Sequence, residues 1–414
     1  MKILHLSPSA NSSNSAAHRI HESILGVGED SRALVYTGSA VPQSYKIKTH
    51  YPYSYLKKRI FDRLNNILAK SMYASKKNSL PWSNPRYKVK ISNIINKLDP
   101  DIVNLHWLAD SSVDLRDLAL NCKSTQFVWT LHDVWPITGG CHCNLDCSNW
   151  RVGCNDCPQI GGGVNEKNNV HRYFNDKKED IELIKNLTVV APSKWLQKNA
   201  AESPVFSSRK VVNIPNPINT HIYSPLLNNE SNYGLNSHDF IVSYGASGLE
   251  SSPHKGFVFF KELVKIFKES DRVKFLVFGG RNSSPISHEN NVLWLGEVRD
   301  HAVLREILSS SDLFLSTSLQ DNFSSLLLEA SSMGLPSIAF DIGGNSDIVR
   351  DNESGFLVQS GNVEELARKI KYLRDNKCKA AGFGESARIY TVGSFSYDVV
   401  SLEYVNLYRQ VLNE

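Results

Sequence analysis

Two runs of alternating strands and helices, separated by a proline-rich turn, are the feature that most limits how this chain can fold. Apolar segments typical of buried strands lie at residues 2–6, 31–36, 101–105, 127–131 and 187–191, with helical patterns at 16–25 and 91–98. The turn at 213–217 (NIPNP) interrupts regular structure, and the alternation then restarts with strands at 240–244, 274–278, 292–295 and 313–316. Such alternation is typical of a parallel sheet covered by helices on both faces. We therefore expect an α/β protein with two doubly wound, Rossmann-like domains.

The length and composition agree with two globular domains. A chain of 414 residues is too long for one ordinary core, and we place the boundary between residues 215 and 216. Hydrophobic residues make up 41% of the chain and charged residues 21%, as is typical of a soluble protein. No apolar run reaches the roughly 18 residues of a membrane span, and the N-terminus lacks the pattern of a signal peptide. We therefore expect a cytoplasmic protein.

Two carboxylates mark a candidate site in the second half of the chain. Residues 313–348 read as a strand, a polar loop, a helix, a second strand and a glycine turn, and Asp321 and Glu329 lie eight positions apart across the loop-to-helix junction. The loop acid could reach a sugar ring, while the helix acid could accept hydrogen bonds from ribose hydroxyls. Ser324 and Ser325 open the helix, whose free N–H groups favour an anion such as a diphosphate. The alternative is a surface helix with two solvated acids.

This stretch resembles the retaining glycosyltransferases of family four, which have the GT-B fold, with two Rossmann-like domains facing each other across a cleft. The signature of that family is two glutamates separated by seven residues, a small-Gly-x-Pro turn and a Gly-Gly loop. Asp321 stands in the place of the first glutamate and Glu329 in that of the second, residues 333–336 (MGLP) match the turn, and the loop is matched by Gly343, Gly344 and Asn345. The resemblance implies a nucleotide-diphosphate sugar donor and chemistry that needs no metal ion or other cofactor.

The resemblance also gives the two domains different tasks. Residues 1–215 correspond to the acceptor-side domain, and residues 216–393 correspond to the domain that binds the nucleotide sugar. The final helix resembles the family's terminal segment, which crosses back to pack on the first domain. We therefore expect residues 394–414 to complete the first domain.

Further residues match functional positions of the family. His132, just past the strand at 127–131, matches a histidine that contacts the donor sugar near its reacting carbon, and His106 follows the preceding strand in the same manner. Lys255, in a Lys-Gly pair, matches a lysine that places a charge on the leaving diphosphate. Either histidine could instead be structural. The implied catalytic residues are His132, Lys255 and Asp321, and the implied donor-binding residues are Lys255, Ser324, Ser325, Glu329, Gly343, Gly344 and Asn345.

A block of cysteines is the second specific signal. Five of the seven cysteines lie within residues 141–157, and Cys154-x-x-Cys157 has the spacing of a zinc knuckle. Cys147 with either Cys141 or Cys143 could complete four thiolates. A subset of bacterial polysaccharide glycosyltransferases carries a similar block, and the resemblance favours Cys141, Cys147, Cys154 and Cys157 as ligands of a structural zinc. The alternatives are reduced thiols or labile disulfides.

A basic stretch precedes this block. Residues 57–90 contain ten Lys or Arg and a single acid, with apolar and aromatic residues interleaved. Such a stretch could lie on an anionic membrane surface, or it could be a solvated helix with a basic outer face.

The expected function follows from these features together. The resemblance implies transfer of a sugar from a nucleotide-diphosphate donor to a hydroxyl of a lipid-linked saccharide, with retention at the anomeric carbon. It places this step in the biosynthesis of capsule, O-antigen (lipopolysaccharide) or exopolysaccharide, in the cytoplasm and peripherally at the inner face of the cytoplasmic membrane, with no nucleic-acid partner. Two other hypotheses stay open: a sugar-nucleotide epimerase of the GT-B type, and a non-enzymatic zinc-dependent nucleic-acid-binding module.

Overall fold

The chain divides into two compact units. The computed structural model describes residues 1–9, 15–37, 80–83, 88–109, 113–161, 164–226, 233–236, 238–246, 248–280, 287–289 and 291–414. The first unit comprises Met1–Pro217 and Tyr397–Glu414, and the second comprises Ile218–Ser396. The boundaries expected at 215 and 394 differ from these by two and three residues. Most of the basic stretch at 57–90 lies outside the described residues.

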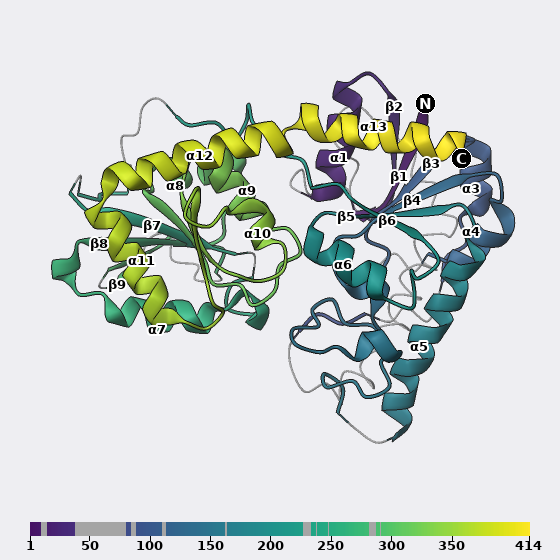
Figure 1. The fold of residues 1–414 in the computed structure, drawn as a ribbon, viewed down its shortest axis with the longest axis horizontal. Helices are drawn as coiled ribbons and strands as arrows, with labels where there is room; N and C mark the ends of the chain where they lie inside the picture. The colour runs from purple at the N-terminus through teal and green to yellow at the C-terminus, as the bar shows by residue number, and fades with distance from the viewer. Residues whose placement is uncertain are drawn as a thin grey trace. The chain divides into compact units, whose positions relative to one another are not determined.

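The first unit is built on a six-stranded sheet with the strand order β2-β1-β3-β4-β5-β6 (Figure 1). All five strand pairs are parallel. Every residue of β3 and β5 is buried, as expected for strands that are covered on both faces. The strands are β1 (Lys2–Ser9), β2 (Asp30–Thr37), β3 (Ile102–Leu105), β4 (Gln126–Thr130), β5 (Leu187–Ala191) and β6 (Lys210–Asn213).

Helices from both ends of the chain complete the first unit. The last helix, α13, packs against α1 and β4, and Figure 1 shows it as a yellow ribbon beside the purple N-terminal helix. Tyr404 and Tyr408 of α13 are fully buried, and Asn104 of β3 donates a hydrogen bond of 2.7 Å to the hydroxyl of Tyr408. The helices are α1 (Ala16–Gly26), α3 (Ser92–Leu98), α4 (Leu115–Asn121), α5 (Val164–Leu183), α6 (Lys194–Glu202) and α13 (Tyr397–Asn413).

The second unit has a seven-stranded sheet with the order β13-β12-β11-β7-β8-β10-β9. The edge strand β9 is antiparallel to β10, and the other strand pairs are parallel. The strands are β7 (Phe240–Gly245), β8 (Val273–Phe278), β9 (Ser287–Glu289), β10 (Val292–Trp294), β11 (Leu313–Ser316), β12 (Ser337–Phe340) and β13 (Gly355–Val358). The two sheets confirm the predicted α/β class with two doubly wound units.

Helices cover both faces of the second sheet over two separate apolar clusters. Helix α11 packs on α7, and α12 packs on α9. The helices are α7 (Phe257–Ile266), α8 (His301–Ser309), α9 (Ser325–Ser332), α10 (Asn345–Ile348), α11 (Val363–Asp375) and α12 (Lys377–Phe395). No helix in the described part of the chain is both long enough and apolar enough to cross a membrane.

Close backbone contact fixes α12 against the turn that follows α9. A Cβ atom on Gly384 would lie 2.1 Å from the carbonyl oxygen of Gly334, which no side chain could occupy without movement of the backbone. Gly382, in the same helix, has nothing within 4 Å of the corresponding position. The glycine at 384 therefore sets the separation of α12 from the end of α9.

Gly382 and Gly384 of α12 should respond to alanine in opposite directions. Gly384→Ala should lower the free energy of unfolding of the second unit by about 1–3 kcal/mol, because the methyl group overpacks the contact with Gly334. Gly382→Ala should raise it by about 1 kcal/mol, because alanine is the better helix former and meets no neighbour. Urea denaturation followed by circular dichroism measures both changes. Equal effects of the two substitutions would contradict this packing.

Candidate functional site

An ion pair joins two of the residues implied as catalytic. Nζ of Lys255 lies 2.9 Å from Oδ2 of Asp321, and the two side chains are 24% and 16% exposed. Lys255 ends the short 3₁₀ turn Pro253–Lys255 that follows β7, and Asp321 lies in the loop after β11. Strands β7 and β11 are parallel neighbours, so both side chains come from the carboxyl ends of adjacent strands. This edge of an open α/β sheet is where ligands of such folds bind.

Two glycines bring the loops of this ion pair together. Gly256 has a φ of +69°, and a Cβ there would lie 1.8 Å from the carbonyl oxygen of Thr317. Gly343 has a φ of +53°, and a Cβ there would lie 1.9 Å from the carbonyl oxygen of Asp321. The same oxygen accepts the N–H of Gly344 at 3.0 Å. The Gly-Gly loop thus holds the backbone of Asp321 directly, a contact that only glycine allows at this conformation.

Helix α9 begins beside this loop. Ser324 is its N-cap, and its hydroxyl accepts the N–H of Leu327 at 3.4 Å, while Ser325 is the first residue of the helix. Glu329 lies one turn further on and is buried, with 3% of its surface exposed. This burial argues against the alternative of a surface helix with two solvated acids, because water has almost no access to Glu329.

Two residues of the same loops, His254 and Asn345, carry no charge at neutral pH. Burial, followed by the nearby ammonium of Lys255, lowers the pKa of His254 to about 4, so this imidazole is neutral at pH 7. The side chain of Asn345 is fully buried and donates to the carbonyl of Phe340 at 3.0 Å. Asn345 therefore stabilises the turn after β12 through its side chain.

His132 lies in the first unit, two residues after β4. Its Nε2 is 3.0 Å from Nδ1 of His106, which follows the neighbouring strand β3. Burial lowers the pKa of His132 to about 4, so this side chain is a neutral imidazole at physiological pH. The structure thus joins His132 to His106 in one unit, and Lys255 to Asp321 in the other.

The four cysteines predicted as zinc ligands line one small cavity of about 10 Å³. Cys141, Cys154 and Cys157 are buried, and the N–H of Gly139 lies 3.2 Å from Sγ of Cys154. Burial raises the pKa of the Cys154 thiol to about 11. No cysteine of the described chain is in a disulfide. Among the described residues, no three His, Cys, Asp or Glu side chains are arranged to hold a metal ion, so the zinc site stays a prediction.

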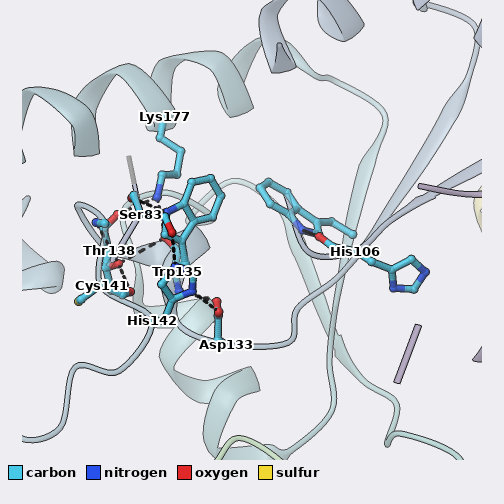
Figure 2. A network of polar contacts seen from close by, with 10 residues as sticks. Ser83, His106, Asp133, Trp135, Thr138, Cys141, His142 and Lys177 are labelled. Carbon is cyan, nitrogen blue, oxygen red and sulfur yellow. Dashed lines mark hydrogen bonds and ion pairs between the residues drawn. The ribbon is translucent and has the colours of Figure 1, made fainter. Parts of the chain in front are cut away.

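A polar network that the sequence analysis missed surrounds this block (Figure 2). The imidazole of His142 lies 2.5 Å from the carboxylate of Asp133 through Nδ1 and 2.8 Å from the hydroxyl of Ser83 through Nε2. Lys177 of α5 donates to the carbonyls of Trp135 and Thr138 at 2.6 and 2.9 Å. Burial lowers the pKa of this lysine to about 7. No spacing in the sequence signals the contacts of Ser83 and Lys177, because they join segments 39 to 59 residues apart.

A cavity of about 380 Å³ lies next to this network in the first unit. Trp135 and Tyr173 contribute aromatic surface to it, and Lys88, Arg172 and Asp180 contribute charge. Its volume is in the range of small-molecule sites.

Comparison with known proteins identifies the second unit. Residues 242–376 match the family model described as "Glycosyl transferases group 1". The chain is 24% identical over 330 residues to the putative colanic acid biosynthesis glycosyl transferase WcaC of Escherichia coli, which covers 75% of this chain and 77% of the relative. It is 26% identical over 184 residues to the UDP-Gal:alpha-D-GlcNAc-diphosphoundecaprenol alpha-1,3-galactosyltransferase of Escherichia coli, covering 41% of this chain and 46% of the relative. Three further curated relatives are matched over only 30%, 32% and 43% of their own lengths.

The fold is shared with a solved enzyme over the whole chain. The sucrose-phosphate synthase from Thermosynechococcus elongatus aligns with a TM-score of 0.67 at 17% identity, covering 100% of this chain and 99% of that one. Its likeness supports the fold. The chain therefore has the GT-B fold, and its residues 242–376 are similar to the domain described for the group 1 glycosyltransferases.

Proposed function

We propose that this chain is a retaining glycosyltransferase that moves a sugar from a nucleotide-diphosphate donor to a hydroxyl of a lipid-linked saccharide. The observation that carries the proposal is the Lys255–Asp321 pair, held at the carboxyl ends of β7 and β11 inside the matched family domain. The start of α9 and the buried Glu329 lie on the segment that directly follows this loop. The cation at Lys255 and the N-terminal end of α9 suit the diphosphate of a nucleotide, and the buried acid Glu329 suits its ribose.

Each residue of the second unit has a distinct role in this proposal. The ammonium of Lys255 and the N–H groups at Ser324 and Ser325 stabilise the negative charge of the departing diphosphate. Asp321 keeps Lys255 oriented through their 2.9 Å contact and accepts hydrogen bonds from the sugar. Glu329 accepts hydrogen bonds from the ribose hydroxyls. The backbone of Gly343 and Gly344 and the turn at Asn345 position the sugar ring.

The proposed chemistry needs no covalent intermediate on the protein. The donor bond loosens toward an oxocarbenium-like state, and the leaving phosphate helps to take the proton of the acceptor hydroxyl from the same face. His132 contacts the sugar near the reacting carbon. Protein cations serve the diphosphate in the place of a divalent metal ion.

The acceptor and the biological setting rest on the relatives. One is named for a galactosyltransferase that acts on a diphosphoundecaprenol-linked sugar, and another for colanic acid biosynthesis. We infer a lipid-linked saccharide acceptor and a role in capsule, O-antigen or exopolysaccharide assembly, at the cytoplasmic face of the membrane. Both relatives are named as transferases, which favours transfer over the epimerase hypothesis. The family match covers the segment of the proposed donor site rather than the cysteine block, which argues against a nucleic-acid module.

We also propose a structural zinc ion held by Cys141, Cys147, Cys154 and Cys157. These thiols line one cavity, and a backbone N–H already points at Cys154. Burial lowers the pKa of Lys177 to about 7, whereas negative charge on Cys154 and Cys141 acts in the opposite direction, so four thiolates at this place would favour the charged form of the lysine. Such a site would pin the loop after β4 and would leave the transfer chemistry to other residues.

Glu329→Gln should weaken donor binding more than turnover. Loss of the carboxylate should raise the donor KM about tenfold to a hundredfold, since hydrogen bonds to a charged group are worth about 1.5–3 kcal/mol. Thermal stabilisation of the purified protein by a panel of nucleotide sugars identifies the donor first, and steady-state kinetics then measure KM. Glu364→Gln, at an exposed position on α11, is the matched control and should change neither value. An unchanged donor KM in Glu329→Gln would remove the ribose role.

Zinc should copurify with the protein at about one ion per chain. Elemental analysis of the purified chain measures the content, and a chelator should lower the melting temperature of the first unit because metal binding is coupled to folding. Cys154→Ser should abolish the zinc content, whereas Cys378→Ser, at an exposed position, should leave it unchanged. A zinc-free protein whose melting does not respond to chelator would contradict the proposal.

A further inference from the structure

Three neighbouring strands of the first sheet each contribute one histidine to a continuous row. His5 lies within β1, His106 directly follows β3 and His132 lies two residues after β4. Strand β3 pairs with β1 on one side and with β4 on the other. The backbone N–H of His106 also donates to the carbonyl of Leu6 at 3.0 Å. The row therefore crosses the strands and is fixed at each step by the sheet.

The rings of this histidine row are joined by two hydrogen bonds. Nδ1 of His5 lies 2.8 Å from Nε2 of His106, and Nδ1 of His106 lies 3.0 Å from Nε2 of His132. The ring planes of the first pair differ by 15° and those of the second by 25°. His5 and His106 are each 1% exposed. Water therefore has little access to these two rings.

All three rings are neutral at physiological pH. Burial, followed by the charge of His21, holds the pKa of His5 well below its ordinary value. Burial and the neighbouring His5 and His132 do the same to the pKa of His106. A neutral imidazole carries one N–H and one bare nitrogen. His106 can thus donate only one of its two hydrogen bonds and must accept the other.

Proton counting then leaves two possible directions for the row. Either every N–H points toward His132, or every N–H points toward His5. The end at His5 decides between them, because Nε2 of His5 is buried and has no hydrogen-bond partner within the described part of the chain. If the row ran toward His5, this atom would carry a buried N–H without an acceptor, which is rarer in proteins than an unsatisfied acceptor. The row therefore runs from His5 through His106 to His132.

We propose that His106 is a positioning residue that donates its Nδ1–H to Nε2 of His132 and so holds His132 in the tautomer with its proton on Nδ1. The role of His132 beside the sugar rests on the proposed function, whereas the tautomer follows from the row itself. No assigned site residue other than His132 belongs to the row.

This tautomer suits the chemistry proposed for His132. An Nδ1–H can only donate a hydrogen bond, so this tautomer matches an acceptor such as a sugar oxygen. A neutral ring also adds no positive charge beside a carbon that becomes oxocarbenium-like, which a protonated imidazole would destabilise. The row thus supplies orientation to the reacting centre without supplying charge.

Nitrogen NMR of the full-length protein tests the tautomer directly. The protein is labelled with ¹⁵N-histidine, and the signals of His132 among the 13 histidines are assigned by their loss in His132→Asn. We expect Nδ1 of His132 to be protonated and Nε2 to be bare, unchanged between about pH 6 and 8 since its pKa is lowered to about 4. A proton on Nε2, or an imidazolium at pH 7, would overturn the proposal.

Two variants of His106 separate positioning from packing. In His106→Asn the amide group takes the place of Nδ1 and can still donate to His132, whereas in His106→Gln it takes the place of Nε2 and faces His5. We expect His106→Asn to keep the His132 tautomer and to change kcat by no more than about threefold. His106→Gln should lose the tautomer and lower kcat about tenfold, with donor KM little changed. Equal kcat and equal His132 spectra in the two variants would reduce His106 to a packing residue.

The two readouts also separate this inference from the proposed function. The NMR measurement needs neither substrate nor turnover. A wrong tautomer in an active transferase would overturn the role of His106 alone. The expected tautomer in a protein that binds no nucleotide sugar would overturn the proposed function and leave the histidine row standing.

Discussion

The contact between Lys255 and Asp321 depends on two backbone positions at which no side chain fits. Gly256 lies against the carbonyl of Thr317, and Gly343 lies against the carbonyl of Asp321 itself. These approaches bring the loops after β7, β11 and β12 within reach of each other, and the 2.9 Å ion pair joins the first two of them. The parallel sheet places three loops at one edge, and glycine lets them touch. A charged pair that is only partly exposed persists because its two loops are fixed in this way.

The strands and the fold class could be predicted because buried parallel strands appear in a sequence as short continuous apolar runs. Short apolar runs mark β4, β5 and β11, each within one residue of its observed position. Helix α12 could not be predicted in the same way, since Gly382, Gly384 and Gly393 lower its helical propensity. Its packing against Gly334 stabilises the helix in the folded chain, and that contact joins residues 50 positions apart.

In the candidate site, too, the features set by neighbouring residues could be predicted from the sequence, and the contacts between distant residues could not. Spacing alone placed Asp321, Ser324 and Glu329 on one loop and helix, and the observed N-cap at Ser324 agrees with the predicted helix start. Their assignment to a nucleotide sugar stays a prediction. The ion pair of Asp321 with Lys255 joins residues 66 positions apart, and the link between His5 and His106 joins residues 101 positions apart. The neutral state of His254 depends on its burial. No local pattern records such contacts.

The two units prepare opposite electrostatic conditions for the proposed transfer. The second unit keeps a charged lysine at the position expected for the leaving diphosphate, and the neighbouring His254 adds no charge of its own. The first unit buries its histidines so that the ring expected near the sugar stays neutral. Negative charge grows on the diphosphate while positive charge grows on the anomeric carbon, so a cation helps the first and harms the second. In the proposed transfer, the burial of His106 and the partial exposure of Lys255 would both serve to place positive charge only beside the leaving group, where negative charge develops.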